Sequence, residues 1–138
     1  MCSREKLIDQ FLAAHGWSQA AREPLAGDMS ARRYVRLIRG EDRAVLMDAD
    51  EPADAFWRMT LWLRSHGLSA PNIIGNRCKN GLLLLEDFGD LPVSRLIVER
   101  PEKADEVFAA CIDLLLFLRQ QPPPNLEQPD AGVLVDWT

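Results

Sequence analysis

The feature that most constrains the fold is a change in the spacing of apolar residues, from helical to extended, that occurs twice along the chain. The first stretch, residues 3–15, has helical spacing, with Ser3 as a plausible N-cap and Gly16 as the stop. The residues after it are spaced as in a hairpin or meander of three strands, near 23–26, 32–39 and 43–49.

A second helix and a second group of strands follow. The stretch DEPADAFWRMTLWLRSHG predicts a helix, because Asp50 or Glu51 can cap it, Pro52 suits its first position and Gly67 can end it. The stretch APNIIGNRCKNGLLLLEDFGD predicts two strands, joined by a tight hairpin turn at Asn80-Gly81 that needs a positive φ. This order favours an α+β domain with a five-stranded, mostly antiparallel sheet and one helix between its third and fourth strands.

The remaining residues predict a short helix in LPVSRLIVER and a long one in PEKADEVFAACIDLLLFLRQQ. The long helix has an apolar stripe, and Ile112, Leu116 and Phe117 leave little polar face in its middle, so we expect it to be buried on more than one side. The tail PPPNLEQPDAGVLVDWT resumes an apolar pattern at the last residues. We therefore expect these residues to be the N-terminal part of a longer protein.

Composition excludes several classes of partner. The net charge of −5 and pI near 5.0 argue against a nucleic-acid or anionic-membrane partner, since either favours a basic face. The three cysteines have no C-x-x-C spacing and predict neither a disulfide framework nor a zinc site. The N-terminus lacks the apolar core of a signal peptide, and no apolar run reaches the roughly 20 residues that a membrane span needs. We expect a soluble cytoplasmic protein.

Two stretches carry a family resemblance. LLLLEDFGD resembles the fifth strand and hinge of the aminoglycoside phosphotransferase and choline kinase family. PLAGDMSARRYVRL followed by AVLMDADEP resembles the phosphate loop and third strand of its bacterial N-acetylmuramate/N-acetylglucosamine kinase-like subgroup. The likeness covers essentially all 138 residues, which would form the N-terminal part of a relative more than twice that length.

The resemblance implies a protein-kinase-like fold, with residues 1–90 as the nucleotide-binding small lobe and 91–138 as the linker and first helices of a large lobe. It implies a parent enzyme that moves the γ-phosphoryl group of ATP, with Mg²⁺, to a hydroxyl group of a small molecule. An amino sugar is the first choice of acceptor, before an aminoglycoside or a choline-like alcohol. Two alternatives stay open: a non-catalytic module that docks or self-associates through the helix at 102–120, and an α+β domain unrelated to nucleotides.

The resemblance also implies a nucleotide site. Leu84 would lie at the back of an apolar pocket, while the Leu85 carbonyl and the Asp87 N–H group would contact adenine. Backbone N–H groups of the loop at 27–31 would face anionic oxygens, although a plain hairpin turn would explain this loop equally well. The residues implied for the cofactor are Gly27, Asp28, Met29, Ser30, Arg32, Arg33, Val45, Met47, Leu84, Leu85, Glu86 and Asp87.

The third strand departs from the general kinase pattern. Most kinases carry a lysine or arginine there that holds the phosphates, whereas AVLMDA offers Met47 and Asp48. Arg32 or Arg33 could supply the missing cation, because a guanidinium group matches phosphate oxygens. Asp48 could pair with Arg58 of the second helix. A solvated strand face is the alternative explanation for the arginines of the strands, which cluster where an exposed sheet surface would be: Arg32, Arg33, Arg36, Arg39 and Arg43.

The chemistry of transfer is absent from these residues. The letters Asp87-Phe88-Gly89 match a kinase magnesium motif by chance, because no H-R-D-x-x-x-x-N loop precedes them. Neither His15 nor His66 begins an H-x-D-x-x-x-x-N motif, and both are expected to have structural roles at helix ends. We therefore expect no catalytic residue and no magnesium ligand in this chain, and place both in the missing lobe.

Overall fold

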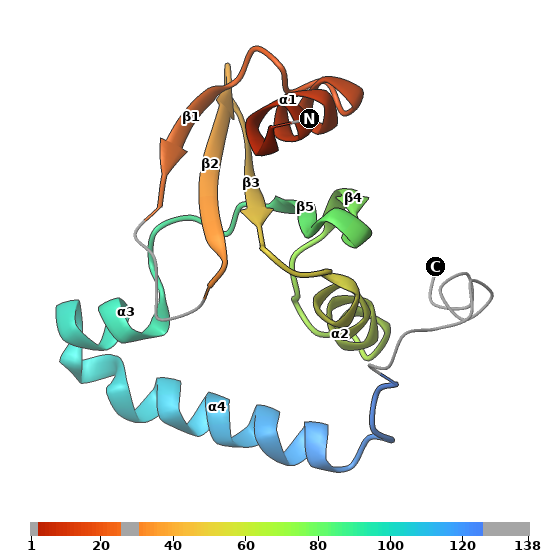
Figure 1. Ribbon diagram of the computed structural model, residues 1–138. Coiled ribbons are helices and arrows are strands. Elements are labelled where there is room, and N and C mark those ends of the chain that lie inside the picture. The colour runs from red at the N-terminus through yellow and green to blue at the C-terminus, as the bar shows by residue number, and fades with distance from the viewer. Residues whose placement is uncertain (1–2, 26–30, 126–138) are drawn as a thin grey trace. The chain divides into compact units, whose positions relative to one another are not determined.

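A computed structural model describes residues 3–25 and 31–125 (Figure 1). The described residues up to Asp87, together with Asn125, form one unit, and Phe88–Pro124 form a second; each is described by itself. The elements are α1 (Arg4–Ala14), β1 (Ala21–Pro24), β2 (Arg33–Arg39), β3 (Asp42–Asp48), α2 (Asp54–Ser65), β4 (Ile73–Arg77), the 3₁₀ turn η1 (Cys78–Asn80), β5 (Leu82–Glu86), α3 (Val93–Glu99), the 3₁₀ turn η2 (Pro101–Lys103) and α4 (Ala104–Arg119).

The first unit contains a five-stranded sheet in the order β1-β2-β3-β5-β4, and every neighbouring pair of strands is antiparallel. Helix α2 connects β3 to β4. The predicted fold class is therefore confirmed: this is an α+β unit with the architecture of a kinase-like small lobe.

The turn between β4 and β5 differs from the prediction. It is the 3₁₀ turn η1, and Gly81 alone takes a left-handed conformation, with φ of 72°, while Asn80 does not. The expected tight Asn-Gly hairpin was wrong for this reason. A Cβ at Gly81 would lie 2.3 Å from the Ala49 carbonyl oxygen, and the Ala49 N–H group donates to the Gly81 carbonyl at 2.9 Å. Glycine is required there both by its φ and by the close approach of the chain that leaves β3.

One face of the sheet is covered by α1. The helix begins after Ser3, whose hydroxyl accepts a hydrogen bond from the Lys6 N–H group, as the sequence predicted. Its buried side chains Phe11 and Leu12 pack against residues of three strands. The strand residues that share this buried cluster are Leu37, Ala44, Leu46, Leu82 and Leu84.

The other face carries a second cluster. Buried Met47, Leu83 and Leu85 point to this side, together with Ala53 and Cys78. The half-buried residues that pack against it are Tyr34, Val45, Phe56, Trp57 and Ile73. Consecutive residues of β3 and β5 thus belong to opposite clusters, because side chains alternate across a strand.

The two histidines end helices, as predicted. His15 follows α1 and its Nδ1 lies 2.9 Å from the Phe11 carbonyl oxygen. His66 follows α2 and its Nδ1 lies 2.8 Å from the Trp62 carbonyl oxygen. Both imidazoles contact a carbonyl that the helix end leaves without an intrahelical donor, which is a structural role.

The second unit contains α3, η2 and α4. Most of α4's large apolar side chains are exposed, and Leu115, for example, is 65% exposed. The burial that we expected for this helix is therefore not provided by the residues that the structure describes. None of the described helices is both long enough and apolar enough to cross a membrane.

Candidate functional site

The sheet face opposite α1 carries an apolar strip made by neighbouring strands. In one row Val45 pairs with Arg36 on β2 and with Leu85 on β5. In the next row Met47 pairs with Tyr34 and with Leu83. Partners on antiparallel strands point to the same face. The strip therefore runs across β2, β3 and β5 and ends beside the segment that leaves β5.

The structure brings three predicted cofactor residues together on this strip, namely Val45, Met47 and Leu85. It places Leu84 on the opposite face, fully buried in the α1 cluster. Leu83, which the sequence reasoning did not select, lies on the strip beside Met47. The alternation along LLLL would have assigned it, had the register of β5 against β3 been known.

A buried ion pair lies at the end of the strip. Arg36 on β2 donates through Nε to Asp87 Oδ2 at 2.7 Å and through Nη2 to Oδ1 at 3.2 Å. Both side chains are only 6% exposed. The sequence reasoning selected Asp87 for its backbone N–H group and left Arg36 on a solvated face, so it missed this pair. Arg36 shares its face with Val45 and Leu85, but this follows from the register of three strands, so no local pattern in the sequence could have found the pair.

Asp48, at the end of β3, is held by arginines from two other elements. Arg4 of α1 donates to its Oδ1 through Nε at 2.9 Å and through Nη2 at 2.5 Å. Arg33 of β2 donates to its Oδ2 at 3.2 Å and to Asp50 at 3.0 Å. The predicted pair of Asp48 with Arg58 was therefore wrong, because Arg4 and Arg33 reach the carboxylate instead.

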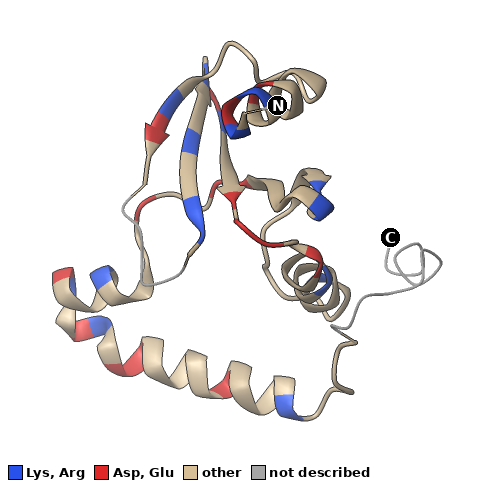
Figure 2. Cartoon of the chain, viewed as in Figure 1, with Lys and Arg blue, Asp and Glu red and all other residues tan. Residues whose placement is uncertain are grey.

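Arg32 and Arg33, which were predicted to bind the phosphates, both contact other side chains of the described unit. Hydrogen bonding to Asp50, followed by the charge of Asp48, raises the pKa of Arg33 above its ordinary value. Its charge is already matched by two carboxylates. Arg32 lies over the ring of Phe56 on α2, at 5.3 Å from the ring centroid. Cationic residues recur along β2 and acidic ones gather where β3 ends and α2 begins (Figure 2).

Helix α2 buries charge without partners. Arg58 is fully buried, and Nε, Nη1 and Nη2 make no hydrogen bond to any residue that the structure describes. Asp54, one turn earlier, likewise has a buried Oδ2 without a partner there. An uncompensated buried charge destabilises a protein strongly. The fully buried Arg58 is therefore a source of instability in the described unit.

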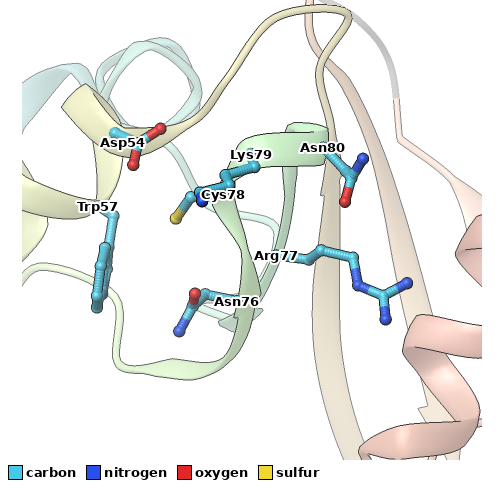
Figure 3. Close-up of a pocket in the computed structure, with 7 residues that line it drawn as sticks. All are labelled: Asp54, Trp57, Asn76, Arg77, Cys78, Lys79 and Asn80. Carbon is cyan, nitrogen blue, oxygen red and sulfur yellow. The ribbon is translucent and has the colours of Figure 1, made fainter. Parts of the chain in front are cut away.

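A cavity of about 320 Å³ lies between the start of α2 and the β4–η1 segment (Figure 3). The Cys78 thiol points toward Asp54 and Trp57 of the helix. Burial, with the nearby charge of Asp54, raises the pKa of Cys78 to about 12. The thiol is therefore protonated at neutral pH and is a weak nucleophile. The cavity is lined by Asp54, Trp57, Asn76, Arg77, Cys78, Lys79 and Asn80, none of which was predicted to bind the cofactor.

The structure does not describe most of the predicted phosphate loop, and its described residues hold no metal cluster. Gly27, Asp28, Met29 and Ser30 lie outside the described residues. Within residues 3–25 and 31–125, no group of three or more His, Cys, Asp or Glu side chains could hold a metal ion. The carboxylates of Asp48 and Asp87 are paired with arginines, and that of Glu86 accepts a hydrogen bond from the Asn72 N–H group. These residues do not fit a magnesium site.

Comparison of the sequence with known proteins identifies the family of this chain. Residues 21–136 match the model of the phosphotransferase enzyme family. The chain belongs to this family, and the sequence resemblance is confirmed. It is similar to the N-acetylmuramate/N-acetylglucosamine kinase of Caulobacter vibrioides, with 33% identity over 94% of this chain and 44% of the relative. It is also similar to the enzyme of the same name in Pseudomonas aeruginosa, with 32% identity over 83% of this chain and 35% of the relative. The chain thus spans less than half the length of these curated relatives.

Proposed function

We propose that this chain is the nucleotide-binding part of an ATP-dependent phosphotransferase that moves the γ-phosphoryl group of ATP to a hydroxyl group of a small molecule. The observation that carries the proposal is the apolar strip at Val45, Met47 and Leu85, which ends at the segment leaving β5. Membership of the phosphotransferase family supports it.

In this proposal the adenine ring lies over the half-buried Val45, since Met47 and Leu85 are themselves buried in the cluster beneath it. An extended backbone beside an apolar surface can present one carbonyl and one N–H group to the purine edge, and the Leu85 carbonyl and Asp87 N–H group would do so. Glu86 is exposed and would lie at the rim. The loop with Gly27, Asp28, Met29 and Ser30 would bind the phosphates through its N–H groups, with Arg32 or Arg33 adding charge.

The chain would contribute binding rather than the chemical step. Phosphoryl transfer needs a residue that orients the acceptor hydroxyl and ligands for Mg²⁺, which neutralises charge on the phosphates. The sequence has no H-x-D-x-x-x-x-N motif, and the described residues hold no metal cluster. We place both functions outside these residues and expect the chain alone to be inactive as a kinase.

The acceptor proposed is an amino sugar. The support is the name that the two relatives share, which describes kinases of N-acetylmuramate and N-acetylglucosamine. A cytoplasmic setting is part of the same proposal, since it fits the free thiols of Cys78 and Cys111.

Titration calorimetry with ATP and with GTP tests the nucleotide proposal. Adenine offers an amine donor and a ring-nitrogen acceptor on its edge, whereas guanine offers the reverse, so a carbonyl and N–H pair should prefer ATP by at least about tenfold. At 100 times its Kd, ATP would also stabilise the protein by about 2.7 kcal/mol and raise the Tm by several degrees. No binding of ATP, or equal binding of both nucleotides, would overturn it.

A second candidate function is a binding module that docks on a partner, or on a second copy, through α4. It is favoured by the exposed side chains Phe108, Ile112 and Leu115. Apolar patches of this kind mark interaction surfaces. Sedimentation velocity over a hundredfold range of concentration tests self-association, and Leu115→Glu should abolish any association seen. A monomer at every concentration would remove the self-association form of this candidate.

A further inference from the structure

We propose that the buried Arg36–Asp87 ion pair positions the purine-reading backbone, with Arg36 acting as a positioning residue that does not itself touch the nucleotide. This inference rests on the proposed function. It assigns a role to Arg36 and to the carboxylate of Asp87.

The geometry points to the backbone rather than to the base. Arg36 starts from β2, and its guanidinium group passes the β3 residue Val45 to reach Asp87, which follows β5. Two parallel N–H to oxygen contacts, at 2.7 and 3.2 Å, fix both the position and the plane of the carboxylate. A side chain held in this way restricts the peptide to which it is attached.

The segment is anchored from both sides of β5. Glu86 points away from the strip, and its carboxylate accepts a hydrogen bond from the Asn72 N–H group at 2.9 Å. The Glu86 N–H group donates to the Asn72 carbonyl oxygen, also at 2.9 Å. Asp87 is held from the opposite direction by β2. Glu86 is thus tied to Asn72, the residue before β4, and Asp87 to β2, at the last residues of the first unit.

The residues after Asp87 differ from it in exposure and backbone conformation. Phe88 is 61% exposed and Gly89 has a φ of 88°, with nothing within 4 Å of the place where a Cβ would lie. The backbone can change direction at Gly89 while the ion pair keeps residues 86 and 87 fixed. The position of the pair therefore separates a rigid reading segment from the start of the second unit.

Stability alone does not explain a pair buried this deeply. Removing two charges from water offsets most of their attraction, and an apolar pair of similar volume is often as stable or more so. A role in fixing geometry accounts for the retention of the charges. The stabilising role and the positioning role of the pair can be separated by experiment, because an apolar pair can restore packing but cannot restore the two directed hydrogen bonds.

The test compares Arg36→Met, Asp87→Leu and the double variant with the unaltered chain. Each single change removes one side of a buried ion pair and should lower the Tm by about 10 °C. The double variant should regain most of that loss. Its ATP affinity should nevertheless remain about tenfold weaker, with reduced preference for ATP over GTP, measured at a temperature where all variants are folded. Arg36→Lys, which keeps the charge but loses the fork, should be intermediate.

The control is the exposed pair of Arg22 and Asp9, joined at 2.6 Å. The double variant Arg22→Met/Asp9→Leu should keep both Tm and ATP affinity. A double variant of Arg36 and Asp87 that binds ATP with unaltered affinity and preference would overturn the positioning role while leaving the proposed function intact. Failure of the unaltered chain to bind ATP would overturn the proposed function first. Should the double variant remain unstable, hydrogen exchange at residues 86–88 decides: unchanged protection relative to the unaltered chain overturns the inference.

Discussion

The two faces of the sheet are built on different principles. The α1 face is closed by apolar side chains, among which Leu12, Leu37 and Leu84 have no exposed surface. The opposite face combines apolar residues with a buried ion pair at Arg36 and a cavity beside Cys78, and on α2 the buried Arg58 has no hydrogen-bond partner in the part of the chain that the structure describes. Departures from an apolar core are expected at functional sites. We therefore expect the α1 face to contribute mainly stability and the opposite face to contribute binding.

The largest effect should come from neighbouring residues of β3 that point to opposite faces. Leu46→Ala removes a nearly fully buried side chain from the α1 cluster and should lower the free energy of unfolding by about 3 kcal/mol. Val45→Ala, at a half-buried position of the strip, should cost only about 1 kcal/mol while weakening ATP binding. Urea unfolding and calorimetry measure both quantities. Equal losses of stability would remove the distinction between the faces.

The second prediction concerns the unpartnered charge. Arg58→Met keeps an unbranched side chain of similar length and removes a buried charge that has no hydrogen-bond partner among the described residues. We expect the variant to be more stable by about 2 kcal/mol in urea unfolding. Arg43→Met, at an exposed position on β3, is the matched control and should change stability by less than about 0.5 kcal/mol. A less stable Arg58→Met variant would show that the guanidinium group has a partner in solution.

Sequence patterns predicted the fold because each element carries local signals. Ser3 and Gly16 bound the first helix, and the alternation in β2 and β3 gave both strands to within a residue or so. The turn at Gly81 was predicted at the right place but with the wrong geometry. A 3₁₀ turn and a tight hairpin share a glycine with positive φ, so the residue type alone does not distinguish them.

The candidate site was predictable only in part. Val45, Met47 and Leu85 are recognisable in the sequence, but the face to which each leucine of LLLL points depends on register between strands distant in the chain. For the same reason the partners of Asp48 and Asp87 were not predictable. Arg4 lies 44 positions before Asp48, and Arg36 lies 51 positions before Asp87. Long-range pairs of this kind are set by the packing of the sheet and leave no local pattern.

A smaller effect concerns pH on the cavity side of the sheet. The pKa of Cys78 is raised from 9.0 to about 12, so the folded chain keeps a proton that the unfolded chain loses above pH 9. The resulting stability is fully present below about pH 9 and is lost as the pH rises towards 12. The difference in unfolding free energy between the unaltered chain and Cys78→Ala should therefore shrink by about 1 kcal/mol between pH 8 and pH 10. A difference that does not change with pH would mean that the thiol is accessible to solvent.

The smallest effect is expected one strand away from the buried pair. Arg22 on β1 pairs with Asp9 of α1 at 2.6 Å, with side chains 41% and 61% exposed. Arg22→Gln should change the free energy of unfolding by less than about 0.5 kcal/mol, because solvent screens the charges in both folded and unfolded chains. Raising the salt to 0.5 M should remove even this difference, whereas the effect of Arg36→Met should persist, since a buried pair is screened much less. Similar salt dependence at both arginines would show that the Arg36–Asp87 pair is open to water, and the contrast between a solvated and a buried arginine on neighbouring strands would be lost.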